Sequence, residues 1–318
     1  MRRILSCALF AILTSAPLLH AQVTISPLAT ISDLVRRGQF TQVIETANPL
    51  LATGKLPPAN EGVVCVYLGY AYQQRGEFTK ATASYEKALT VINRDGQHPT
   101  DYAAALATLA AVYAEIGQFD TAKHVLLRSV HLLEDANDHA GAAMIWNNLA
   151  TIAAERHSRG ESHKDMARSI AESKLANDIT TSELAALATT EGRIAELDGD
   201  PRTAISHFQH ALELWQQSHQ DQQPKTAWLY VLLGSAYLQA SDVSNARVNT
   251  ARGLSMLEAS SGRETPRYFA AQIAYSKVLD ASGAHDEASR LRKDAQAALD
   301  TGTDRQRAQS QVSVAALR

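Results

Sequence analysis

Residues 68–89 read LGYAYQQRGEFTKATASYEKAL, in which a glycine turn separates two stretches of helical pattern. Gly76 suits the left-handed residue that commonly ends a helix, and apolar or small residues recur at helical spacing on both sides of it. The small residues Gly69 and Ala81 let the two helices touch closely, and Tyr85 fills the space around that contact. The segment therefore predicts an antiparallel pair of helices.

The same turn recurs along the chain. Equivalent tetrapeptides stand between two helical patterns at Arg37-Gly38-Gln39-Phe40, Arg75-Gly76-Glu77-Phe78, Ile116-Gly117-Gln118-Phe119, Asp198-Gly199-Asp200-Pro201, Ala240-Ser241-Asp242-Val243 and Ser282-Gly283-Ala284-His285. Early in the second helix of every copy, including a less regular fourth one, comes a small or slim residue: Val43, Ala81, Ala122, Ser162, Ala204, Ala246 and Ala288. These positions lie 38 to 42 residues apart. Because one hairpin cannot cover its own apolar faces, the period predicts a stack of about seven hairpins.

The composition agrees with an all-α fold. The chain has 318 residues, of which 45% are hydrophobic and 20% charged, so it can bury a core and is too apolar to be disordered. Stretches rich in Val, Ile and Thr, which mark strands, are missing from the sequence.

The hairpins from Pro27 to Leu299 resemble tetratricopeptide repeats, whose usual length is about 34 residues. The copies here are several residues longer, and in this they are similar to the repeats of kinesin light chains and related bacterial proteins. The run Trp146-Asn147-Asn148-Leu149-Ala150 strengthens that likeness. The resemblance implies a right-handed superhelix, an α-solenoid, whose inner wall is lined by the first helix of each hairpin.

The fourth copy departs most from the pattern. Its turn, residues 155–163, has neither a glycine nor an aromatic residue at the expected places. A gapless register puts Ser162, Met166 and Ile170 on the packing face, whereas a five-residue shift would put Ala167 and Ala171 there instead. We prefer the gapless register because it preserves the period.

The predicted repeat domain covers residues 22–299. The first copy is short, and we expect it to act as an N-terminal cap. Residues 300–318 are rich in Gln, Ser and Arg and are expected to form either a frayed capping helix or a disordered tail.

Residues 1–21 have the pattern of a secretory signal peptide. Arg2 and Arg3 precede an apolar run that is followed by Ala21, after which we expect cleavage; Pro17 disfavours a cut after Ala16. An uncleaved membrane anchor is the alternative, although the run is shorter than the roughly 20 apolar residues that span a bilayer. The pattern predicts an exported protein, periplasmic or secreted, without stable membrane insertion after cleavage.

The net charge bears on the kind of partner, and the cysteine content bears on disulfide formation. The formal net charge is −3, and removal of a leader with two arginines makes the mature chain more acidic, which disfavours nucleic acid as a partner. Cys65 is then the only cysteine, so an intramolecular disulfide is impossible. We interpret Cys65 as a small buried hydrophobic residue rather than a reactive thiol.

The sequence carries no recognisable catalytic motif. It lacks a phosphate-binding loop, a dinucleotide fingerprint, a zinc-protease histidine pair and a nucleophile elbow. Some histidines have spacings that metal ligands can have, and we expect them to meet solvent: His207 and His210 with Glu213, His157 with His163, and His124 with His131. We therefore expect no enzyme activity, no cofactor and no metal.

The most favoured function is binding of a peptide or protein in the concave groove. Residues of the first helices that lie off the packing face would meet such a ligand: Tyr70, Gln73, Gln74, Glu115, Asn147, Glu155, Arg193, Glu196, Ser235, Gln239, Lys277 and Asp280. An asparagine such as Asn147 can hydrogen-bond a peptide backbone in both directions, and Arg193 can pair with an acidic residue. The set lacks the several Lys and Asn residues with which some family members clamp a C-terminal carboxylate.

Two other functions remain open from the sequence. The protein could organise a cell-envelope complex through its outer surface, or it could be an enzyme subunit with an unrecognised site around Glu155, Arg193 and Glu196.

Overall fold

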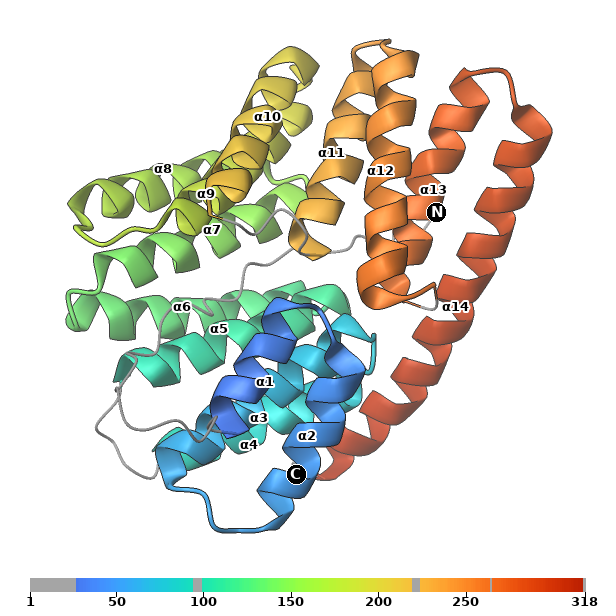
Figure 1. Ribbon diagram of the computed structural model, residues 1–318. Coiled ribbons are helices and arrows are strands. Elements are labelled where there is room, and N and C mark those ends of the chain that lie inside the picture. The colour runs from blue at the N-terminus through green and yellow to red at the C-terminus, as the bar shows by residue number, and fades with distance from the viewer. Residues whose placement is uncertain (1–26, 94–98, 219–223, 264, 317–318) are drawn as a thin grey trace.

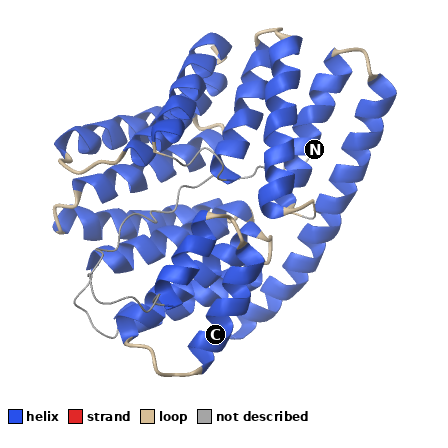
Figure 2. Ribbon diagram, in the orientation of Figure 1, coloured by secondary structure: helices blue, strands red, loops and turns tan. Residues whose placement is uncertain are grey.

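The computed structural model describes residues 27–93, 99–218, 224–263 and 265–316, and the regular structure in these ranges is helical throughout (Figures 1 and 2). The helices pair in chain order as seven hairpins: α1 (Pro27–Arg36) with α2 (Phe40–Ala52), α3 (Pro58–Gln74) with α4 (Phe78–Asn93), α5 (Pro99–Glu115) with α6 (Phe119–Asp135), α7 (His139–Glu155) with α8 (Arg159–Leu175), α9 (Thr181–Asp198) with α10 (Pro201–Gln217), α11 (Pro224–Gln239) with α12 (Val243–Ser261), and α13 (Pro266–Ala281) with α14 (His285–Ala316). The all-α superhelix expected from the period is confirmed. The predicted signal peptide, 1–21, lies outside the described residues.

Close contact between the two helices of each hairpin depends on the small residue identified in the sequence. All seven of these residues have 0% exposure: Val43, Ala81, Ala122, Ser162, Ala204, Ala246 and Ala288. On the facing helix, a Cβ added to Gly69 would lie 2.7 Å from the Tyr85 ring, and one added to Gly234 would lie 2.1 Å from the Thr250 hydroxyl. No larger side chain fits at these positions without separating the helices.

The fourth copy follows the gapless register. Ser162 and Met166 are buried, Ile170 packs against the same apolar cluster as Met166, and Ala167 is exposed. His157 takes the left-handed conformation that glycine adopts in most of the other turns, with φ of 57°. The turn is therefore kept without its usual residue, at a cost of about 1–2 kcal/mol.

Cys65 is 1% exposed, and burial raises the pKa of its thiol to about 11. The interpretation as a buried hydrophobic residue is confirmed.

Within the described ranges, no helix combines the length and apolarity that a bilayer crossing needs.

The superhelix curves until its last hairpin reaches the early ones (Figure 1). A Cβ on Gly76, in the α3–α4 turn, would lie 2.7 Å from Cδ of Pro266 at the start of α13, and one on Gly38 would lie 3.7 Å from Cβ of Ser260. The long α14 runs back toward α4 and contacts it. We call this meeting of early and late hairpins the seam.

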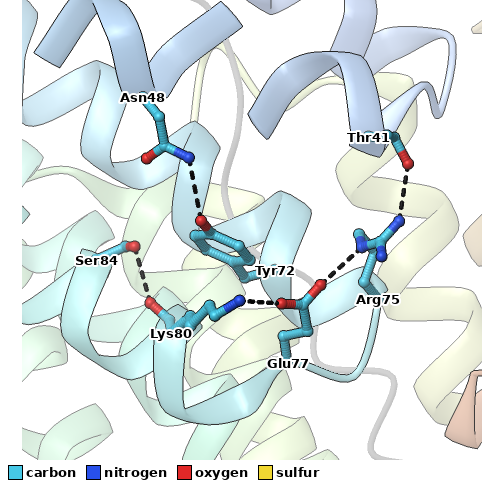
Figure 3. A network of polar contacts seen from close by, with 7 residues as sticks. All are labelled: Thr41, Asn48, Tyr72, Arg75, Glu77, Lys80 and Ser84. Carbon is cyan, nitrogen blue, oxygen red and sulfur yellow. Dashed lines mark hydrogen bonds and ion pairs between the residues drawn. The ribbon is translucent and has the colours of Figure 1, made fainter. Parts of the chain in front are cut away.

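A network of polar contacts fixes the α3–α4 turn beside the seam (Figure 3). Arg75 donates to Glu77 and to Thr41 of α2, both at 2.8 Å, and Lys80 donates to Glu77 at 2.7 Å. Although burial opposes the shift, the hydrogen bonds from Lys80 and Arg75 lower the pKa of Glu77. Tyr72 accepts a bond from Asn48 of α2 at 3.2 Å. The turn that meets Pro266 is thus tied to the preceding hairpin.

Replacing Gly69 with Leu is expected to destabilise the protein by about 1–3 kcal/mol, because the new side chain collides with Tyr85. Chemical denaturation followed by circular dichroism measures the effect. Gly160→Leu is the matched control, since Gly160 is exposed and a Cβ there meets nothing within 4 Å. Equal stability of the two variants would contradict the close contact between α3 and α4.

Candidate functional site

The first helices of the hairpins form the inner layer of the superhelix. Contacts run from α1 to α3, then to α5, α7, α9, α11 and α13, whereas successive second helices do not contact each other to a similar extent in the described part of the chain. In a curved stack, the helices on the inner side lie closer together than those on the outer side, so the first helices, which contact each other, lie on the inner side. We call the side of α3 to α13 that faces the axis the inner wall.

The twelve sequence-predicted residues all lie on first helices, as expected, and the structure sorts them by partner. Tyr70, Gln73, Gln74 and Glu115 gather beside the seam; Glu155 joins Arg193, and Glu196 joins Ser235 and Gln239. Asn147 is buried in α7 without such a partner. Lys277 and Asp280 are exposed on α13, where Asp280 bonds His285 at 2.7 Å within its own hairpin.

Glu155 and Arg193 form an ion pair between α7 and α9, with side chains 0% and 12% exposed. One turn earlier, the hydroxyls of Thr151 and Thr190 lie 3.0 Å apart and join the same two helices. A buried charge needs its partner, because isolating it in a low-dielectric interior is costly. Arg193 therefore already faces an acidic group of the chain itself.

Asn147 has 0% exposure, and neither its amide nitrogen nor its amide oxygen has a hydrogen-bond partner in the described residues. All of α7 from Ala140 to Glu155 is buried around it. An amide left unpaired in such surroundings costs about 1–3 kcal/mol. The amide of Asn147 therefore places an unpaired donor and an unpaired acceptor on the inner layer, and it lowers the stability of the protein.

Glu196 lies one turn after Arg193 and is half-buried. Gln239 of α11 donates to its Oε1 at 3.2 Å. Burial in the wall raises the pKa of Glu196 to about 7, and the weaker opposing influences are the charge of Arg193, a bond from Ser235 and the charge of Lys277. Near neutral pH this carboxyl is therefore present in both forms and can either donate or accept a hydrogen bond.

Beside the seam, Arg267 of α13 donates to Gln74 of α3 at 3.1 Å and to Glu115 of α5 at 2.9 Å. The Arg267 and Glu115 side chains are 16% and 8% exposed. Burial raises the pKa of Glu115 to about 7 even though Arg267 lowers it. Gln73, one residue before Gln74, accepts a bond from the buried Tyr85 hydroxyl at 3.0 Å.

Sequence reasoning missed Arg267. Its partners lie 193 and 152 residues earlier in the chain, and only the accumulated curvature of the stack brings them together. No local spacing marks such a contact.

Three of the histidines with metal-like spacing lie near acidic side chains. His207 lies 3.6 Å from Glu191, His210 lies 3.9 Å from Glu213, and His163 lies 2.9 Å from Asp198. In the ranges that the structure describes, no group of three or more His, Cys, Asp or Glu side chains is placed to hold a metal ion.

Fold and inner wall together define a superhelical helix-repeat protein with a polar, partly buried inner layer. Residues 62–135 and 183–259, which span α3 to α6 and α9 to α12, match the family model "Tetratricopeptide repeat". In these two segments the repeats match tetratricopeptide repeats, as the sequence pattern predicted. A comparison with curated proteins gave no match.

Solved structures share the fold at low sequence identity. The Rap conjugation gene regulator of the plasmid pLS20, in complex with the Phr* peptide, has a TM-score of 0.69 at 12% identity, covering 87% of this chain and 74% of that one. A Rap protein complexed with competence and sporulation factor has a TM-score of 0.63 at 10% identity over 90% and 89% of the two chains. NprR in complex with its cognate peptide NprX has 0.62 at 13% identity over 87% and 78%. These similarities show the fold alone.

Replacing Arg193 with Ala is expected to cost about 3–5 kcal/mol, because it leaves the Glu155 carboxylate buried without its partner. Denaturation midpoints of the folded variant measure this loss. The double variant Glu155→Gln, Arg193→Met should recover much of the stability, since it leaves no uncompensated charge. A single variant as stable as the wild type would show that the pair is not buried in solution.

Proposed function

We propose that the protein binds an extended peptide, or a short segment of a partner protein, on the inner wall along α7 to α11. The observation that carries the proposal is the fully buried and unpaired amide of Asn147. A peptide backbone offers both an N–H and a C=O, and one asparagine side chain can satisfy both. The stability forgone at Asn147 would be regained when a ligand binds.

The neighbouring residues support the same ligand chemistry. Glu196, Ser235 and Gln239 add polar groups on the next two first helices, and the exchangeable proton of Glu196 lets it meet either a donor or an acceptor. Three of the solved structures with this fold are complexes with a peptide or factor. The longer repeat and the run from Trp146 to Ala150 further favour the kinesin-light-chain-like type.

Replacing Asn147 with Ala is expected to weaken binding of the partner about tenfold or more, since a pair of neutral hydrogen bonds contributes about 1–3 kcal/mol. Stability should be unchanged or slightly increased, because the variant removes an unpaired buried amide. The partner is first captured with the wild-type protein, and its affinity is then measured for Asn147→Ala and for a control, His210→Ala, on the outer helix α10.

Binding on the inner wall and binding on the outer surface predict different affinities for these two variants. If the inner wall is the binding site, only Asn147→Ala loses affinity. If His210→Ala weakens binding equally, or Asn147→Ala binds as tightly as the wild type while folded, the outer surface is the interface and the scaffold function replaces this one.

We further propose that the protein is exported and works in the cell envelope or outside the cell. The support is the pattern of residues 1–21 in the sequence. The intact mass of the protein purified from the expressing cell should correspond to a chain that begins at Gln22. Recovery of the chain with Met1 in the soluble cytoplasm would contradict export.

A further inference from the structure

The seam is held by different forces from the rest of the superhelix. The described clusters of buried apolar residues each join neighbouring hairpins: one spans α1 to α3, another spans α11 to α13, and the others lie between. None of these clusters includes residues from both sides of the seam. Across the seam, Arg267 bonds Gln74 and Glu115, the turns at Gly76 and Gly38 approach Pro266 and Ser260, and α14 contacts α4.

Arg267 is well placed to bridge the seam. Thr265 caps the N-terminus of α13, where its hydroxyl accepts a hydrogen bond from the backbone N–H of Tyr268 at 3.3 Å. Pro266 occupies the first position of the helix, so the backbone that carries Arg267 is fixed. From there one guanidinium bonds two hairpins at once, Gln74 on α3 and Glu115 on α5.

The bridge is also shielded from solvent. With side chains 16% and 8% exposed, the Arg267–Glu115 pair is less screened by water and salt than the exposed ion pairs elsewhere on the chain, such as Arg263 with Glu258. Losing Arg267 would leave the buried Glu115 without the guanidinium that lowers its pKa, and its carboxyl would no longer be joined to α13. The seam therefore contains a polar bridge, whereas the interfaces between successive hairpins bury apolar clusters.

We propose that Arg267 is a clasp: its bonds to Gln74 and Glu115 hold the superhelix closed, and their release opens the inner wall to a ligand. This regulatory role rests on the proposed binding function. In the closed form Asn147 is fully buried, so a ligand can reach its amide only after the wall opens. Opening at the seam leaves the apolar clusters between successive hairpins intact.

The opening is tested by the distance across the seam. In a Cys7→Ala, Cys65→Ala background, spin labels are attached at Glu45→Cys on α2 and Ala259→Cys on α12, both exposed positions. We expect one short, narrow distance distribution for the parent protein. Arg267→Ala should shift the distribution to longer distances and broaden it, and Glu115→Gln should do so to a smaller extent.

Arg263→Ala is the matched control, because Arg263 precedes α13 and pairs with Glu258 of α12 without crossing the seam. The charge swap Arg267→Glu, Glu115→Arg should restore the short distance if the pairing itself is responsible. Removal of residues 302–318 tests whether the end of α14 holds the seam instead. An unchanged distribution in folded Arg267→Ala, or an equal shift in Arg263→Ala or in the truncated chain, overturns the clasp.

Access to the inner wall is measured without a ligand. In a background with both native cysteines replaced, Cys7→Ala and Cys65→Ala, the single thiol of Asn147→Cys is treated with iodoacetamide. Its reaction is expected to be at least tenfold faster when Arg267→Ala is added, and no faster with Arg263→Ala. Equal rates would show that the seam does not control access. If the clasp passes both tests while Asn147→Ala leaves partner binding unchanged, the proposed function fails and the conformational device remains.

Discussion

The structure depends on one steric constraint, the close approach of the two helices in each hairpin. At the position where they touch, the chain has only alanine, serine or valine, and none of these side chains is exposed in any copy. Glycines such as Gly69 and Gly234 meet the second helix from the other side. Because each hairpin is built around the same contact, each stacks on the next with a similar rotation, and the rotations add up to a curve. The inner wall and the seam are both consequences of that curve.

Two carboxyl groups of the inner layer show how this packing changes the pKa of side chains. Glu115 and Glu196 come from different hairpins, and burial raises the pKa of each to about 7. Their partners differ, however: Glu115 faces a guanidinium across the seam, whereas Glu196 is bonded by the neutral Gln239. The first carboxyl is engaged in holding the protein together, while the second retains a capacity to exchange its proton with a ligand.

The fold could be predicted from the sequence because its determinant is local and repeated. The small residue, the turn and the apolar faces all lie within about 40 residues, and even the irregular fourth copy kept the register that the period required, with Met166 buried. The candidate site could be predicted only as far as which helices carry it. Arg193 was expected to meet a ligand, but its nearest acidic partner, Glu155, is one repeat earlier on the neighbouring first helix. Arg267 was missed because its contacts depend on the sum of all the rotations between hairpins.

A closed superhelix with a buried inner layer needs an interface that can separate without unfolding. Apolar burial between successive hairpins is unsuited to that role, because breaking it exposes a core cluster and unfolds the repeat. A polar bridge is better suited, since both Arg267 and Glu115 gain hydration when they part, which offsets part of the lost attraction. The contrast between the apolar interfaces and the polar seam therefore favours the seam as the place where the superhelix opens without unfolding a repeat. Such an arrangement lets a ligand that satisfies Asn147 shift the balance toward the open form, because the amide is unpaired only in the closed one.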